Sequence, residues 1–192
     1  PLRKRNDWMK TPLARSPYLF ESERLGFRNW SWDDRPEFAA LNADEKVMAH
    51  FPQTLSERQT VQFIERLQRH YQTWGYNYFA TEIRATGEWI GFIGLARQEY
   101  ESAYTPATDI GWRLKTAAWG KGYATEGARR CLEYAFDELQ LSRIIATCTE
   151  RNTKSERVMQ NIGMTRLGTF KHPRLRDFPD YERCICYEIR KR

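Results

Sequence analysis

The most regular pattern of apolar and polar positions lies between Trp119 and Leu139, where a glycine-rich turn leads into an amphipathic helix. Gly120 and Gly122 flank Lys121, so the backbone can turn tightly and leave its N–H groups open to a ligand. A helix N-terminus carries unpaired N–H groups, so the turn predicts a pyrophosphate site. Apolar residues then recur at helical spacing and predict one buried face. That face consists of Ala124, Ala128, Cys131, Leu132, Ala135, Phe136 and Leu139.

The same turn also fits a simpler interpretation, in which Gly-x-Gly before a helix is only a tight turn. It is not a dinucleotide fingerprint, because Thr125 stands where the third glycine belongs, and it is not a P-loop, because Gly-Lys-Ser/Thr is absent. The choice between a plain turn and an anion site therefore depends on what surrounds it.

The rest of the chain alternates between helical and strand-like patterns. Capping boxes predict two helices, one after Ser31 with Asp34 and one after Ser56 with Gln59. A further helix begins near Asn152 and ends before Gly163, and residues 123–138 form the helix described above. Strands are predicted at 18–28 in two pieces and at 76–84, 88–97, 108–114, 143–149, 165–170 and 183–189.

This order of elements predicts an α+β domain with helices on the faces of a sheet. The segment between strands 108–114 and 143–149 contains a turn and a helix, so these two strands should be parallel. Ligands of such sheets bind beyond the carboxyl ends of the strands, next to the helix N-terminus. The turn at Gly120 therefore lies where a ligand is expected.

Composition narrows the class of protein. The 192 residues, 41% of them hydrophobic, fit one globular domain over 18–192 after a basic arm over 1–17. Much of the net charge of +6 lies at the two ends, and no basic stripe is interleaved with aromatic residues, which argues against nucleic-acid binding. No apolar run is long enough to span a membrane, and the basic start lacks the apolar segment of a secretory signal.

The four cysteines and three histidines show no metal-ligand spacing, so no metal site is expected. Cys131 lies on the apolar helix face, and Cys184 and Cys186 share one face of a predicted strand. These residues are expected to be buried thiols of a protein in a reducing compartment, the cytoplasm.

Several segments together resemble the GNAT superfamily of acyl-CoA-dependent N-acetyltransferases, and most closely its ribosomal-protein-alanine (RimJ/RimL) branch. They are ESERLGFRNWSWDD, NADEKVMAHFP, GEWIGFIGL, DIGWRLKTAAWGKGYATEG and ERNTKSERVMQNIGM, and they cover most of the chain. The resemblance implies a three-layer α/β/α fold. Its mixed, mostly antiparallel sheet has about seven strands, with a central parallel pair splayed around acyl-CoA.

The resemblance also implies an acyltransferase that moves acetyl from acetyl-CoA to a primary amine by direct attack in a ternary complex. The acceptor is a protein N-terminus or a small-molecule amine. The net charge of +6 makes a polycationic acceptor the less favoured choice. Edge strands near the C-terminus make a homodimer a further expectation.

Two positions depart from the family pattern. Ala117 stands where the superfamily often has Gln or Arg, and Met159 stands where it often has a tyrosine acid. The tyrosine mechanism is therefore not carried over to this chain. Both departures leave a second hypothesis open, that of a non-catalytic CoA-binding or regulatory module.

By resemblance, the CoA pyrophosphate binds backbone N–H groups of the glycine turn, and Lys121 adds charge unless it is simply solvated. The pantetheine arm bonds the main chain of the preceding strand as an added strand. Asn152 bonds the pantetheine or caps its helix, and Arg157 contacts phosphate or lies at the surface. The turn residues are Ala118, Trp119, Gly120, Lys121, Gly122, Tyr123, Ala124 and Thr125, and the strand residues are Ile110, Gly111, Trp112 and Arg113.

Ser155, one helical turn after Asn152, is the candidate donor to the departing thiolate, although a locally satisfied hydroxyl is the alternative. Asp109 is the first candidate base, directly or through water, and an ion pair at the strand edge is its alternative role. Glu82 is the second candidate base. No cysteine nucleophile is required. The acceptor mouth is assigned to His50, Phe51 and His172.

Overall fold

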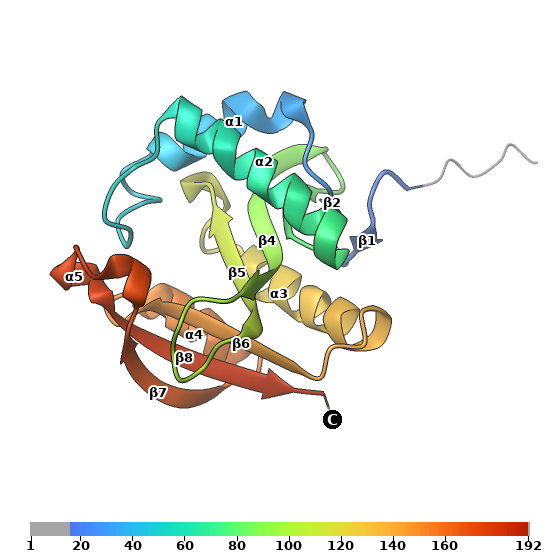
Figure 1. The fold of residues 1–192 in the computed structure, drawn as a ribbon. Helices are drawn as coiled ribbons and strands as arrows, with labels where there is room; N and C mark the ends of the chain where they lie inside the picture. Colours follow the sequence, from blue (N-terminus) through green and yellow to red (C-terminus); the bar gives the residue numbers. More distant parts are fainter. Residues whose placement is uncertain (1–15, 192) are drawn as a thin grey trace, which may run out of the picture.

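The computed structural model describes residues 16–191, so the predicted basic arm lies almost wholly outside the described residues. These residues form an eight-stranded sheet in the order β1-β2-β3-β4-β5-β6-β8-β7 (Figure 1). Every neighbouring pair is antiparallel except β5 and β6, as the sequence predicted. The strands are β1 (Phe20–Glu21), β2 (Leu25–Arg28), β3 (Tyr78–Ile83), β4 (Glu88–Gln98), β5 (Ala107–Leu114), β6 (Arg143–Thr149), β7 (Thr165–Lys171) and β8 (Arg183–Arg190).

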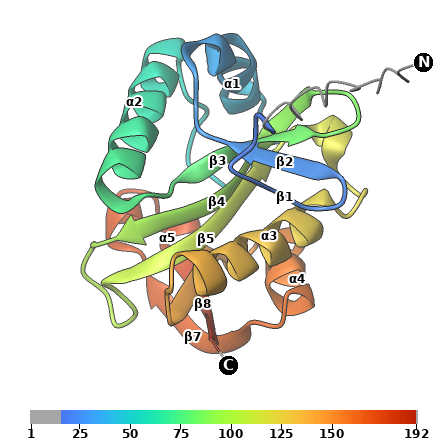
Figure 2. The ribbon, with the colours of Figure 1, turned by 90° about the vertical axis from the view of Figure 1, so that its right-hand side faces the viewer.

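Helices cover both faces of the sheet and make three layers. On one face, α1 and α2 enclose a core that includes Phe38, Ile64 and Phe92. On the other face, α3 and α4 enclose a larger core that includes Ala128 and Met159 (Figures 1 and 2). The helices are α1 (Arg35–Ala43), α2 (Glu57–Trp74), α3 (Tyr123–Glu133), α4 (Thr153–Asn161) and the short α5 (Pro179–Glu182).

Local capping explains where the helices begin and end. Both predicted capping boxes are present, although the one at Ser31 opens a 3-10 turn before α1 rather than α1 itself. The box at Ser56 opens α2, which ends at Gly75 with a φ of 76°. The helix predicted over 123–138 is two pieces, because α3 passes into a π-helical turn at Tyr134–Glu138. Ala124, Phe136 and Leu139 are only partly buried, whereas the other four residues of the predicted face are buried.

The parallel strands β5 and β6 are neighbours over only two residue pairs, Thr108 with Ile144 and Asp109 with Ile145. Beyond Asp109, β5 stays paired with β4 as far as Leu114, whereas β6 stays paired with β8 throughout. The two strands therefore diverge, and each has a backbone edge without a strand partner. This is the splayed pair that the resemblance implied.

Candidate active site

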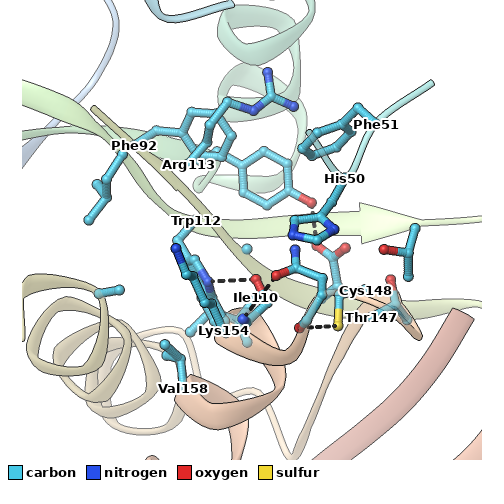
Figure 3. A pocket seen from close by; sticks show the side chains of 18 of the residues that line it. His50, Phe51, Phe92, Ile110, Trp112, Arg113, Thr147, Cys148, Lys154 and Val158 are labelled. Atoms are coloured by element: carbon cyan, nitrogen blue, oxygen red, sulfur yellow. Dashed lines mark hydrogen bonds between the residues drawn. The ribbon is translucent and has the colours of Figure 1, made fainter. Parts of the chain in front are cut away.

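A cavity of about 1510 Å³ opens where β5 and β6 diverge. In Figure 3, Trp112 and Lys154 lie beside the helix α4, on what we call the loop side, and Arg113 and Phe51 lie on the opposite, aromatic side. The walls are β5, β6, the loop 118–125, the first turns of α4, part of α2, and the segments 46–52 and 172–175.

Both glycines of the predicted pyrophosphate loop line this cavity. Gly120 and Gly122 have φ values of 72° and 79°, a region that other residues rarely adopt. The helix α3 begins at Tyr123 without a side-chain cap, and the N–H of Glu126 donates to the carbonyl of Gly122 at 3.0 Å. The N–H groups before Glu126 therefore have no acceptor within the helix, so they are available to an anion in the cavity.

Two of the backbone N–H groups predicted to bind the pyrophosphate already donate to carbonyl groups of the chain. The N–H of Ala118 donates to the carbonyl of Lys115 at 2.9 Å, and that of Trp119 donates to Thr116 at 3.1 Å. These bonds belong to a 3-10 turn that the glycine spacing did not reveal, so the amide set is corrected to begin at Gly120. The indole of Trp119 donates to the carbonyl of Leu114 at 2.9 Å and braces the loop.

The loop is also held by a residue that sequence reasoning missed, Arg24. It donates to the carbonyl of Lys121 at 3.0 Å and pairs with Glu126 at 2.6 Å. Its guanidinium lies 4.6 Å from the ring centre of Tyr123. Lys121 is exposed and is not among the residues that line the cavity, so its side chain fits the predicted alternative of a solvated lysine.

The four predicted pantetheine residues, 110–113, lie just beyond the last pairing of β5 with β6, and all line the cavity. An extended ligand can add to this free edge as a strand does. Gly111 has a second role, because a Cβ atom there would stand 3.1 Å from a ring carbon of Tyr78. Gly111 therefore also lets an aromatic ring pack closely against β5.

Ser155 is fixed by two neighbours in the first turns of α4. Its backbone N–H donates to Oδ1 of Asn152 at 3.1 Å, so Asn152 caps the helix. Its Oγ accepts a hydrogen bond of 3.2 Å from the indole Nε1 of Trp112, drawn as a dashed line in Figure 3. Because an indole N–H only donates, the hydroxyl hydrogen of Ser155 stays free to donate into the cavity. Sequence reasoning named these residues but did not pair Ser155 with Trp112.

Asp109 lines the cavity and is only 8% exposed. It accepts hydrogen bonds from the hydroxyl of Tyr78 at 2.7 Å and from Nε2 of Gln98 at 3.1 Å. Burial raises the pKa of the Asp109 carboxyl to about 6, although both hydrogen bonds act to lower it. These partners are neutral, so they do not form the ion pair considered as its alternative role. Tyr78 and Gln98 were both missed, because their meeting with Asp109 depends on strand register.

Glu82 does not line the cavity, and its prediction as a second base is wrong. Its carboxylate accepts from Nε of Arg28 at 2.6 Å and from the hydroxyl of Tyr18 at 3.0 Å. Arg28 also pairs with Asp34 at 2.6 Å. Glu82 lies four residues along β3 from the cavity-lining Tyr78, a displacement of about 13 Å along the strand. Its role in this structure is to bind β3 to β2 and to the start of α1.

His50 and Phe51 line the cavity, as predicted for the acceptor mouth. Figure 3 shows His50 between Phe51 and Cys148. Burial and the charge of Lys154 lower the pKa of His50, so its imidazole is neutral at pH 7. Burial raises the pKa of Cys148 to about 12, so this thiol is not a thiolate and is no nucleophile.

His172 lines the cavity from the segment between β7 and β8. Its ring centre lies 4.3 Å from that of Tyr100, and its Nδ1 accepts from the N–H of Arg174 at 3.2 Å. Burial and the charge of Arg174 lower the pKa of His172. Both predicted histidines therefore contribute neutral rings to the wall.

On the aromatic side, the side chain of Arg113 lies among the rings of Phe51, Phe63 and Phe92, at 4.4, 5.9 and 5.4 Å from their centres. We call these three rings the aromatic box. Nη1 of Arg113 donates to Oδ1 of Asn42 at 2.6 Å. Burial lowers the pKa of Arg113 to about 10, so it remains charged at pH 7. Sequence reasoning assigned only the main chain of Arg113 and missed this placement.

The loop side carries two cations. Arg157 is exposed and lines the cavity, and Nζ of Lys154, which sequence reasoning missed, lies 4.7 Å from a ring centre of Trp119. Both residues can attract an anionic ligand. Met159 is 1% exposed and belongs to the core, so the position where relatives often have a tyrosine acid offers no proton here.

Known proteins resemble this chain in sequence and in fold. Residues 24–165 match the acetyltransferase (GNAT) domain family. The uncharacterized N-acetyltransferase YnaD of Bacillus subtilis is 33% identical over 151 residues, which cover 78% of this chain and 84% of that protein. The crystal structure of a GNAT-family acetyltransferase from Bacillus anthracis superposes with a TM-score of 0.72 at 32% identity, covering 88% of this chain and 96% of the other.

The fold is also that of RimL, a ribosomal L7/L12 α-N-protein acetyltransferase solved with coenzyme A. The TM-score is 0.70 at 19% identity, over 88% of this chain and 95% of RimL. The chain therefore belongs to the GNAT family of acetyltransferases, and it is an acetyl-CoA-dependent acyltransferase. None of the helices within residues 16–191 is long and apolar enough to cross a bilayer.

Proposed function

We propose that this protein moves the acetyl group of acetyl-CoA to the primary amine of a protein N-terminus or a small molecule, in a ternary complex. The observation that carries the proposal is one cavity in which three features meet. They are the free backbone edge of β5, the uncapped N-terminus of α3 and the buried carboxylate of Asp109. RimL, which shares this fold, was solved with coenzyme A.

In the proposed complex, N–H groups from Gly120 to Thr125 hold the pyrophosphate, with Lys154 and Arg157 nearby. The free edge of β5 holds the pantetheine amides, and Asn152 adds its remaining amide hydrogens. This arrangement leaves the thioester beside Ile110, where a main-chain N–H can stabilise the negative charge that develops on its oxygen.

Two side chains then move protons. Asp109 accepts a proton from the ammonium form of the acceptor, directly or through water, and the neutral amine forms a bond to the thioester carbon. As the C–S bond breaks, the electron pair goes to sulfur, and the free hydrogen of Ser155 is donated to that thiolate. The nitrogen loses its second proton as the amide forms, and that proton returns, directly or through water, to the oxygen of Ser155. Because Trp112 occupies a lone pair of Ser155, the hydroxyl is oriented for this donation.

The pKa of Asp109 favours an α-amine over a lysine side chain. An α-ammonium has a pKa of about 8 and a lysine ammonium one of about 10.4. The pKa of the α-ammonium exceeds that of the Asp109 carboxyl, about 6, by about two, and the pKa of the lysine ammonium exceeds it by more than four. Proton transfer to Asp109 is therefore much less unfavourable from the α-ammonium. The supported acceptor is therefore an amine of low pKa.

The proposal is tested by measuring CoA binding and acetyl transfer with purified protein. We expect acetyl-CoA and a panel of peptides with free N-termini to yield acetylated peptide, detected by mass spectrometry, and one equivalent of CoA. Tight CoA binding without transfer to any amine would instead favour the non-catalytic module. Failure to bind CoA would overturn both hypotheses.

We further propose a cytoplasmic location and a homodimer. All four cysteines are free thiols, which suits a reducing compartment. The strand β7 lies at one end of the sheet and is largely exposed, so its free edge is available to a second copy. Light scattering of the purified protein tests the dimer, and a monomeric mass at micromolar concentration would contradict it.

A further inference from the structure

The lining of the cavity is strongly unbalanced in charge. Among residues 16–191, seven lysine and arginine side chains line it, but only one carboxylate, that of Asp109. Lys154 and Arg157 lie on the loop side, where phosphates are proposed to bind. Three others, Arg66, Arg113 and Arg174, belong to the wall proposed for the acceptor. A cationic amine such as a polyamine would meet repulsion there, and an anionic group would meet attraction.

Arg113 is the most deeply placed of these cations. Its only hydrogen-bond partner in the described residues is the neutral oxygen of Asn42, and its Nε is buried without a partner. Asn42 is itself held, because its Nδ2 donates to Oγ1 of Thr60 at 3.1 Å. A buried guanidinium without an anion is unfavourable, so this side chain is prepared to bind one.

The mouth of the same wall brings two further arginines together. Arg66 comes from α2 and Arg174 from the 3-10 turn Pro173–Leu175, and neither forms an ion pair with a carboxylate of residues 16–191. Both side chains line the cavity, where their like charges repel. Burial lowers the pKa of Arg66, and the charges of Arg69 and Arg174 lower it further. An anion entering between them would relieve this repulsion.

We infer that the acceptor is an amine that also carries a carboxylate, and that the carboxylate binds Arg113 while the amine lies at Asp109. This inference rests on the proposed acetyl transfer. Residues 109, 111 and 113 alternate to one face of β5, with about 13 Å between the Cα atoms of Asp109 and Arg113. The carboxylate therefore lies several bonds from the amine, as in the acidic side chain of a peptide.

A carboxylate suits this site better than a phosphate. The guanidinium offers one planar fork, and the aromatic box around it is apolar. A carboxylate matches the fork with two parallel bonds and carries a single charge. A phosphate carries nearly two charges at pH 7, so its desolvation beside three aromatic rings is more costly.

The test compares the matched peptides Gly-Glu-amide and Gly-Gln-amide, which differ only in the charge of one side chain. Their dissociation constants are measured by calorimetry with CoA present, so that no turnover occurs. We expect Gly-Glu-amide to bind about 10 to 100 times more tightly. Arg113→Gln should reduce this ratio to about 1 to 3, and the exposed Arg58→Gln, outside the cavity lining, should leave it unchanged.

Equal binding of the two peptides by the natural protein, or no measurable binding of Gly-Glu-amide, overturns the inference. A ratio that survives in a folded Arg113→Gln variant does so too. Tighter binding of Gly-phosphoserine-amide than of Gly-Glu-amide would identify a phosphate instead. If Arg113→Gln fails to fold, Arg113→Lys is used instead. It keeps the positive charge but lacks the paired donors of the guanidinium, so Gly-Glu-amide should still bind more tightly than Gly-Gln-amide, but by a smaller ratio than in the natural protein.

The same measurements separate this inference from the proposed function. If CoA does not bind, the acetyltransferase proposal fails. If CoA binds and neutral peptides are acetylated as well as acidic ones, only the inference about the carboxylate fails.

Discussion

At Asp109, burial and hydrogen bonding act in opposite directions on one carboxyl. Burial dominates, and the resulting pKa of about 6 keeps the group ionised at pH 7 while making it a better base than an exposed aspartate. Gly111 contributes indirectly, since a Cβ atom there would stand 3.1 Å from the ring of Tyr78, whose hydroxyl donates to Asp109, and would push that ring away.

This pKa predicts the pH dependence of the reaction. We expect kcat/KM of the free enzyme to fall below about pH 6 as Asp109 becomes protonated, in addition to any limb from the acceptor amine. Asp109→Asn should lower kcat/KM by roughly 10²- to 10⁴-fold and remove the limb near pH 6. A profile with the same acidic limb in the variant would assign that limb to another group.

The raised pKa of Asp109 also predicts how the free energy of unfolding changes with pH. Its pKa is higher in the folded state than its ordinary value of 3.8, so folding favours the proton. The carboxyl therefore imposes no penalty below about pH 4, an increasing penalty between about pH 4 and 6, and a constant penalty above. Asp109→Asn should be more stable by up to about 3 kcal/mol at pH 8, since Gln98 can turn its amide to accept, and no more stable at pH 4. Urea unfolding at both pH values measures this.

Ser155→Ala tests the proton donor. The loss of the hydroxyl should lower kcat roughly 10- to 100-fold while changing the dissociation constant of acetyl-CoA little, because the bond is needed as the thiolate leaves. The exposed Ser142→Ala is a matched control that should match the natural protein. Equal turnover by all three proteins would mean that the hydroxyl of Ser155 has no part in the reaction and that the residue only belongs to the first turn of α4.

Which residues could be predicted depends on how far apart their partners lie in the chain. Asn152 and Ser155 are local partners, and the cap that the structure shows is one of the two roles predicted for Asn152. Tyr78 and Arg113 act through neighbours on other strands and helices, and no spacing within the sequence reveals that register. Glu82 shows the opposite error, because its type suggested a base but its strand position takes it away from the cavity.

The loop before α3 combines a flexible sequence with a fixed conformation. Its glycines adopt positive φ values, the indole of Trp119 holds one end and Arg24 holds the other. The loop therefore presents its amides to the cavity in a prepared arrangement, which lowers the entropy that ligand binding must overcome.

Gly122→Val tests this element. A β-branched residue at a φ of 79° is strained by roughly 1 to 2 kcal/mol, so the loop should change conformation and weaken CoA binding at least about tenfold. Gly75→Val is the matched control, because Gly75 has a φ of 76° and lies at the end of α2 outside the cavity lining. It should lose similar stability without losing CoA affinity. Equal CoA affinity in both variants would remove the loop from the pyrophosphate site.

At the level of elements, sequence prediction worked where a signal was local. The capping box at Ser56 located the start of α2, the box at Ser31 located the 3-10 turn that leads into α1, and Gly163 located the end of α4. The 3-10 turn Thr116–Ala118 and the π-helical turn Tyr134–Glu138 have no such signal, since they depend on how the chain packs. The first of these is why the predicted phosphate-binding amides needed correction.

Over the whole molecule, the sheet consists of two antiparallel halves, β1 to β5 and β6 to β8, joined by the short parallel contact of β5 with β6. The order of elements predicted the parallel contact. Its early end was implied only by family resemblance, because strand divergence leaves no pattern in the sequence.

A ligand that joins the two halves should stabilise the whole domain. CoA at about 100 times its dissociation constant contributes about 2.7 kcal/mol, which corresponds to a rise in Tm of roughly 5 to 10 °C. Pantetheine, which lacks the pyrophosphate, should give a clearly smaller rise at equal concentration. An equal rise with pantetheine would mean that the glycine loop contributes little to binding.

The divergence of β5 from β6 also means that this protein has a sheet edge in its interior. The outer edges at β1 and β7 can meet other proteins, whereas the inner edge is reached only through the cavity. Unpaired strand edges at a surface are a risk for aggregation, whereas this edge faces a cavity lined by other parts of the chain. In the proposed complex the cofactor pairs with this inner edge as an added strand would, so an unpaired edge that most folds avoid would serve to recognise one ligand.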